Sequence, residues 1–213
     1  MTTIIHIQQS TLDAMLLIAA KNDIRYYLNG VYIEWDYERT RAVGCDGHKL
    51  AVHYQFIEGN AGAGSIIIPR DVIERLPKQS SVAYEIQIIQ NEAGAWAIHA
   101  AGVSVSFTPC DATYPDWRRV SHGIKTSGEA AGFDIDYLVA FEKAGAILGG
   151  GKCRIGNRLR IHHNGAQGAI VTLDGIDGFA GVVMPLKEQV GSAGAMFPAD
   201  LITDVNKLEP LAA

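Results

Sequence analysis

The chain has 213 residues, of which 48% are hydrophobic and 19% charged, and its formal net charge at pH 7 is −5. This balance is typical of a compact folded protein and excludes disordered and collagen-like classes. The apolar run at residues 14–20 is too short for a membrane-spanning helix, which needs about 18 or more. The acidic excess argues against a generally basic DNA-gripping surface, although it leaves room for a local basic stripe.

The N-terminus and the cysteines bear on the compartment. The opening residues, MTTIIHIQQS, have neither the basic nor the apolar region of a secretory signal, so we expect a cytoplasmic protein. Cys45, Cys110 and Cys153 are odd in number and widely spaced. This spacing predicts free thiols and does not fit a disulfide framework or a CxxC metal or redox site.

One pattern occurs three times: a short β-rich run, a turn, an amphipathic helix and then several strands. The first copy begins with a strand at residues 4–7 and continues into a helix with apolar positions Leu12, Met15 and Leu16. We expect Ser10 to be the N-cap of that helix, since a serine side chain can accept a hydrogen bond from a free backbone N–H.

The second and third copies repeat this order. The second has a strand at residues 65–69 and a helix at 70–76, which Pro77 should end. The third has an expected strand at 132–135 and a helix after it, which glycines 149–151 should stop. Further strands are expected at residues 26–35, 41–53, 83–89, 95–99, 103–108, 158–163, 169–173 and 179–184. Because one such unit rarely buries enough surface alone, the units should pair helix beside helix, with the sheets outside.

Five segments carry a family resemblance. They read DIRYYLNGVYIEW and RAVGCDGHKLAV within residues 23–52, IIIPR and VIE within 66–74, YPDWRRV at 114–120, FDIDYL at 133–138 and VVMPLK at 182–187. Together, and in this order, they resemble the middle and last domains of the β subunit of the bacterial DNA polymerase sliding clamp. Any one of them alone would be a weak signal.

The resemblance implies an α+β DNA-clamp fold of βαβββ half-domains, with helices on one face of antiparallel sheets. Residues 1–121 resemble the complete middle domain, 122–187 resemble the second half of the last domain, and 188–213 form a C-terminal extension. The first domain and one half-domain of a full clamp are absent from the sequence. Such a shortened clamp is compatible with an origin in a phage or prophage. The family catalyses nothing and needs no cofactor.

The resemblance also implies a groove in which partner proteins insert a short peptide. One wall would contain Arg25, Tyr27, Leu28, Gly47, His48, Lys49 and Leu50, and the other Val182, Met184, Pro185 and Leu186. The apolar members suit an aliphatic or aromatic anchor. Lys49 stands where the family usually has arginine, which would lose bidentate recognition of a carboxylate and keep a positive rim. The ordinary alternative is that these residues are core or turn, with Gly47 at positive φ.

Contact with duplex DNA would use cations on the polar faces of the helices. The candidates are Lys21, Arg70, Arg75, Lys78 and Lys143. Solvated salt bridges to nearby acidic residues explain these charges about as well.

Catalytic and metal sites find little support in the sequence. His162 and His163 would point to opposite faces of a strand, so they cannot chelate one ion together. Cys45 has no orienting acid–base pair nearby, and the run at 149–152 lacks the pattern of a phosphate-binding loop. We therefore expect no catalytic residue, no metal and no cofactor.

Two functions remain open. The first is a clamp-like processivity factor that encircles or associates with duplex DNA and binds polymerase and other partner peptides. The alternative is an adaptor or decoy that binds such peptides without forming a ring on DNA. Three half-domains are an odd number, so one sheet edge should lack a partner, and we expect a homo-oligomer.

Overall fold

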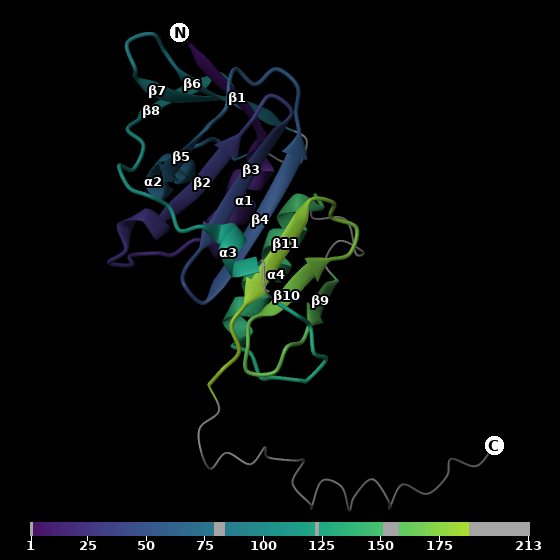
Figure 1. Ribbon diagram of the computed structural model, residues 1–213. Helices are drawn as coiled ribbons and strands as arrows, with labels where there is room; N and C mark the ends of the chain where they lie inside the picture. Colours follow the sequence, from purple (N-terminus) through teal and green to yellow (C-terminus); the bar gives the residue numbers. More distant parts are fainter. Residues whose placement is uncertain (1, 79–83, 122–123, 151–157, 188–213) are drawn as a thin grey trace, which may run out of the picture.

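The computed structural model describes residues 2–78, 84–121, 124–150 and 158–187, and its strands form two antiparallel sheets (Figure 1). The four-stranded sheet has the order β1 (Thr3–Gln8), β6 (Glu85–Gln90), β7 (Trp96–Ala100) and β8 (Val103–Phe107). The seven-stranded sheet has the order β5 (Gly64–Pro69), β2 (Gly30–Trp35), β3 (Arg39–Cys45), β4 (Lys49–Phe56), β11 (Phe179–Val183), β10 (Ala169–Leu173) and β9 (Leu159–His162).

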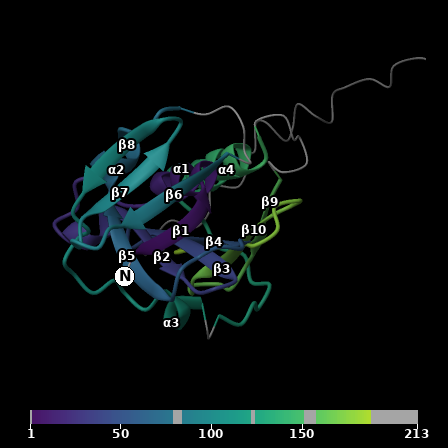
Figure 2. The ribbon, with the colours of Figure 1, turned by 90° about the horizontal axis from the view of Figure 1, so that it is seen from above.

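The helices lie on both faces of the seven-stranded sheet. They are α1 (Gln9–Ile18), α2 (Arg70–Glu74), α3 (Trp117–Ser121) and α4 (Ile135–Leu148), with a 3-10 turn at Tyr26–Leu28. α1 and α4 pack side by side on one face, which we call the helix face, and α3 lies on the opposite, outer face (Figures 1 and 2). No helix among the described ranges is long and apolar enough to cross a membrane.

Strand alternation supplies a separate core to each face of this sheet. Ala42 and Ala51 belong to the larger core, which also contains α1 and the fully buried Phe141 of α4. Their chain neighbours Val43 and Leu50 belong to a smaller core on the outer face. Because neighbouring side chains on a strand point to opposite faces, the same two strands build both cores.

The three repeat units are joined by shared sheets. The opening strand of the first unit, β1, pairs with β6 of the second, and the opening strand of the second, β5, pairs with β2 of the first. The third unit adds to the first, since β11 pairs antiparallel with β4. At this joint a Cβ atom on Gly181 would lie 2.5 Å from the Phe141 ring, so α4 can approach β11 only because residue 181 is glycine.

Two local expectations were wrong. Ser10 is not an N-cap: Gln8 holds that position, and Ser10 is buried inside α1. Residues 132–135 are not a strand: residues 132–134 have no regular secondary structure, Ile135 begins α4, and Leu186 N–H donates to the Gly132 carbonyl. Asp134 instead caps α4 by accepting a hydrogen bond from the Asp136 backbone N–H.

Some of the expected element boundaries are confirmed and others lie at different residues. Gly149 caps the C-terminal end of α4 and Gly150 has a φ of 76°, so the expected stop is confirmed. The strand expected from residue 26 begins only at Gly30, because the preceding residues form the 3-10 turn. α3 was not expected, and none of its residues is buried, so it has no core-facing apolar pattern to read. Lys152 and residues 188–213 lie outside the described residues.

Candidate functional site

A pocket of about 220 Å³ lies on the outer face where the first and third units meet. It is lined by Arg25, Tyr27, Leu28, Cys45, Gly47, His48, Lys49, Leu50, Pro115, Val120, Val182 and Met184. The structure therefore brings both predicted walls together, from segments that lie far apart in the sequence. Of the predicted groove residues, Pro185 and Leu186 follow β11 and do not line the pocket.

The β4–β11 pairing fixes the floor of the pocket. Val182 lies directly opposite Leu50 in the register, and both are nearly buried, as is Leu28. Met184 is 42% exposed and sits at the rim, where its backbone N–H donates to the His48 carbonyl at 2.9 Å. An apolar floor with a flexible methionine at the edge suits an apolar side chain of a ligand.

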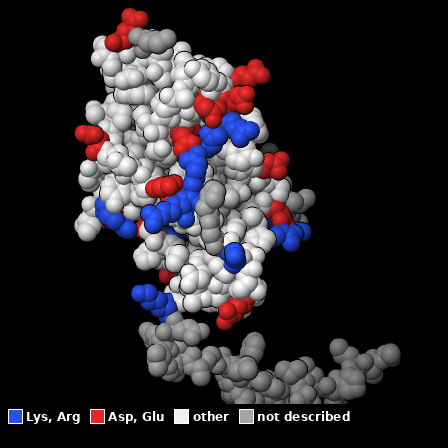
Figure 3. All heavy atoms as spheres, in the orientation of Figure 1, with Lys and Arg blue, Asp and Glu red and all other residues white. Residues whose placement is uncertain are grey.

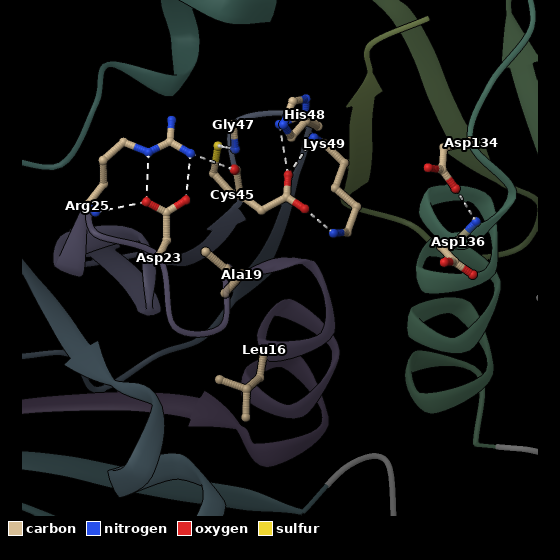
Figure 4. Close-up of polar contacts among 12 residues, drawn as sticks. Leu16, Ala19, Asp23, Arg25, Cys45, Gly47, His48, Lys49, Asp134 and Asp136 are labelled. Atoms are coloured by element: carbon tan, nitrogen blue, oxygen red, sulfur yellow. Dashed lines mark hydrogen bonds and ion pairs between the residues drawn. The ribbon is translucent and has the colours of Figure 1, made fainter. Parts of the chain in front are cut away.

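The turn between β3 and β4 shapes one side of the pocket (Figure 4). The Asp46 carboxylate accepts hydrogen bonds from the backbone N–H groups of His48 and Lys49, both at 2.8 Å. Gly47 has a φ of 93°, as the turn interpretation expected, and a Cβ there would lie 2.7 Å from the Arg25 guanidinium. Glycine is therefore favoured by the backbone conformation, and it also leaves room for the Arg25 guanidinium.

Both cations beside the turn are already paired. Arg25 donates to the Asp23 carboxylate at 2.7 and 3.0 Å and to the Asp46 carbonyl at 2.9 Å, and its hydrogen bonds to Asp23 lower the pKa of that carboxyl to about 2. Lys49 forms an ion pair with Asp46, and its ammonium lies 5.3 Å from the centroid of the Tyr137 ring. The two cations at this rim, Arg25 and Lys49, are thus each ion-paired.

A third wall was missed by the sequence reasoning. Pro115 and Val120 come from the segment that contains α3, which the sequence singled out as YPDWRRV without assigning it to the groove. The Arg118 guanidinium fastens this segment to β2 by two hydrogen bonds to the Glu34 carboxylate, one of them 2.8 Å long. Stacking of Tyr114 on Tyr32, with centroids 4.8 Å apart, holds the start of the segment.

The DNA candidates divide into two groups. The Arg70 guanidinium donates to the carbonyls of Leu16, Ala19 and Ala20 at 2.8 to 3.2 Å, so it caps the C-terminal end of α1. Arg75 pairs with Asp71 at 3.4 Å.

The second group, Lys21, Lys78 and Lys143, is exposed. The outer face has no broad basic area. Acidic and basic side chains lie side by side on it (Figure 3).

Metal-binding groups and the cysteine thiols were the remaining candidates for chemistry in the sequence. These ranges contain no group of three or more His, Cys, Asp or Glu side chains placed to hold a metal ion. Cys45 and Cys110 are free thiols, and burial raises the pKa of both, which disfavours the nucleophilic thiolate. Cys153 lies outside the described residues.

Comparison with known proteins identifies the family. The family model of the DNA polymerase III beta subunit, central domain, matches residues 7–116. This chain belongs to the DNA polymerase III β sliding clamp family. It is 36% identical over 148 residues to the beta sliding clamp of Salmonella typhimurium and 35% identical over 156 residues to that of Escherichia coli K12. These matches cover 68% and 72% of this chain but only 39% and 41% of the relatives, so the chain spans about two fifths of their length.

Solved sliding clamps share the fold. A Pseudomonas aeruginosa sliding clamp superposes with a TM-score of 0.64 at 20% identity, covering 87% of this chain and 66% of that one. The β chain from Streptococcus pneumoniae gives 0.64 at 12% identity, with 87% and 65% covered. The predicted α+β clamp fold is therefore confirmed. Sliding clamps are non-catalytic, in agreement with the prediction that this chain is not an enzyme.

Proposed function

We propose that this chain is a clamp-like processivity factor that binds peptide segments of a DNA polymerase and of other replication proteins in the outer-face pocket. The observation that supports this role most directly is the pocket itself, which needs residues from both the first and the third unit. Each wall alone would be ordinary core or turn. Together they form a concave apolar site, which is the usual form of a site for a peptide anchor.

A peptide titration tests the pocket. The probe is a synthetic peptide that carries the clamp-binding motif of a bacterial DNA polymerase, and its affinity is measured by titration calorimetry. Met184→Asp puts a charge at the apolar rim and should weaken binding at least tenfold. The matched control is Val103→Asp on β8, because Val103 is 45% exposed and Met184 42%, so both variants should fold. Equal affinity of wild type and Met184→Asp would reject the pocket.

Association with duplex DNA is the second part of the proposal. The exposed cations Lys21, Lys78 and Lys143 are the contacts that we assign to it, and they would bind phosphates without sequence preference. Replacing all three by glutamine should reduce DNA retention at low salt and flatten its dependence on salt concentration, measured by fluorescence anisotropy. Retention unchanged by the triple substitution would remove these residues from the DNA surface.

The adaptor alternative is favoured by one specific observation. Two of the five candidate DNA contacts, Arg70 and Arg75, are engaged by α1 carbonyls and by Asp71. A chain that binds the motif peptide but shows no retention on DNA at low salt would be an adaptor or decoy and not a processivity factor.

We also propose that the chain assembles as a homo-oligomer and acts in the cytoplasm, where bacterial DNA is replicated. Support for assembly comes from β9, the last strand of the seven-stranded sheet, which has no strand on its outer side within the described residues.

A further inference from the structure

An apolar stripe leaves the pocket along the outer face of β4. Leu50, Val52, Tyr54 and Phe56 share this face, while the residues between them point to the helix face and are buried. Exposure rises along the stripe, from 5% for Leu50 in the pocket floor to 40% for Tyr54 and 67% for Phe56. Aromatic side chains exposed to this degree on a sheet face are typical of an interaction surface.

The far end of the stripe is held by neighbouring side chains and is still exposed. The Tyr54 and Phe56 rings meet edge to face, with centroids 5.6 Å apart and an interplanar angle of 87°. The Arg39 guanidinium, on the cross-strand partner of Phe56, lies 4.6 Å from the centroid of the Phe56 ring. Tyr54 is also flanked by Gly178, whose carbonyl accepts its N–H at 3.0 Å, and a glycine has no side chain to cover the ring. The two rings are therefore held in place for a partner.

Short side chains form the middle of the stripe and its border on the β11 side. Val52 lies opposite Ala180 of β11 in the register, and Val43 of β3 lies on its other side. The six residue-to-residue steps from Leu50 to Phe56 span roughly 20 Å at the ~3.3 Å rise of a strand. An extended peptide covers the same distance with about six residues.

We propose that Tyr54 and Phe56 form a second docking site for the partner segment that occupies the pocket. The occupant is an extended peptide with two apolar anchors about six residues apart, one in the pocket and one on the Tyr54–Phe56 rings, joined by uncharged residues. This inference rests on the proposed function of the pocket. The continuity of the stripe with the pocket floor supports a single occupant for both ends.

The experiment compares three peptides on the full chain. The short peptide carries only the clamp-binding motif, and two longer ones add eight uncharged residues with a leucine six positions from the motif anchor, at the N-terminal or at the C-terminal end. One extended peptide should bind roughly tenfold more tightly than the short one, by titration calorimetry. The double variant Tyr54→Ser, Phe56→Ser should lose this gain and bind the short peptide as wild type does. Val103→Ser, which removes exposed apolar surface from β8, should keep the gain.

The outcomes separate the two proposals. If the short peptide binds and neither extension gains affinity, or if the gain survives the double variant, the second docking site is wrong while the pocket stands. If no peptide binds wild type, both the pocket and the second site are rejected.

Discussion

The charged side chain of Arg70 stabilises the fold. Its guanidinium completes the C-terminal end of α1, where backbone carbonyls lack partners in the helix. Arg70→Gln should therefore lower the free energy of unfolding by about 1.5–3 kcal/mol, the range for hydrogen bonds to a charged group. Lys143→Gln, at an exposed position of α4, should change it by less than about 0.5 kcal/mol. Urea denaturation measures both, and an Arg70 variant as stable as wild type would contradict the capping role.

His53 should make stability depend on pH. It is buried, its ring Nδ1 is 2.9 Å from the Thr11 hydroxyl, and burial lowers its pKa from 6.5 to about 4. Between these two values the unfolded chain binds a proton that the folded chain does not, so the contribution is complete above pH 6.5 and is lost as the pH falls towards 4. The loss amounts to at most about 3 kcal/mol.

The control for this effect is His53→Gln, which keeps a polar side chain that cannot titrate. Urea denaturation between pH 4 and 7 should show a flatter pH dependence for this variant than for wild type. Parallel curves for the two proteins would show that His53 does not cause the slope.

The family resemblance predicted which side chains meet at the pocket, but not how their charges are used. The groove residues were carried over from the matching segments, and their apolar members suit a buried floor. The pairing of Lys49 with Asp46, and of Arg70 with helix carbonyls, depends on distances that only the folded backbone defines.

At the scale of elements, the packing of β3 on α1 depends on one glycine. A Cβ atom on Gly44 would lie 2.3 Å from the Met15 carbonyl oxygen and 3.1 Å from the Ala19 nitrogen, both backbone atoms that cannot rotate away. Gly44→Ala should push α1 from the sheet and cost about 1–3 kcal/mol of unfolding free energy. At Gly132 the nearest atom is a leucine methyl at 4.0 Å, so Gly132→Ala is the matched control and should be close to neutral. Thermal unfolding of the two variants tests this expectation. A Gly44→Ala variant with an unchanged melting temperature would contradict this packing.

Most elements were predictable because their hydrophobic period is long enough to read. β10 and β11 begin within a residue of the expected ranges and end at or next to them. The expected strand at 132–135 was wrong because residues 132–134 lead directly into α4, which Asp134 caps, and make no strand ladder among the described residues. Its apolar pattern was real, since Phe133 packs against the larger core, but the pattern does not specify a bonding partner.

At the scale of the whole molecule, the third unit attaches to the first through both layers. β11 continues the sheet at β4, and α4 packs beside α1 (Figure 2). The sequence predicted that units pair but placed the odd unit against another chain. In the structure one edge of that unit pairs within the chain, because β11 bonds to the edge of β4 and α4 packs on the surface of α1. Sequence periodicity identifies faces and edges, and it does not say which edges meet.

The other edge of the third unit carries the prediction of assembly. β6 and β9 occupy the same place in their repeats, each followed by two further strands of its sheet. β6 is covered by β1, whereas the described residues place no strand on the outer side of β9. An open edge of this kind is a template for strand pairing, and we expect β9 to pair antiparallel with β9 of a second copy. Light scattering should then give twice the mass of one chain.

The matched variants place this contact on a particular edge. His162→Lys on β9, at an exposed position, puts a charge beside the strand of the second copy in the expected pairing and should yield the mass of one chain, with an unchanged circular dichroism spectrum as evidence of folding. Val103→Lys alters β8, the edge of the other sheet, and should leave the dimer intact. A mass of one chain for wild type at every concentration would exclude assembly. Dissociation by Val103→Lys would instead indicate a head-to-tail contact between β8 and β9, the arrangement that can close into a ring.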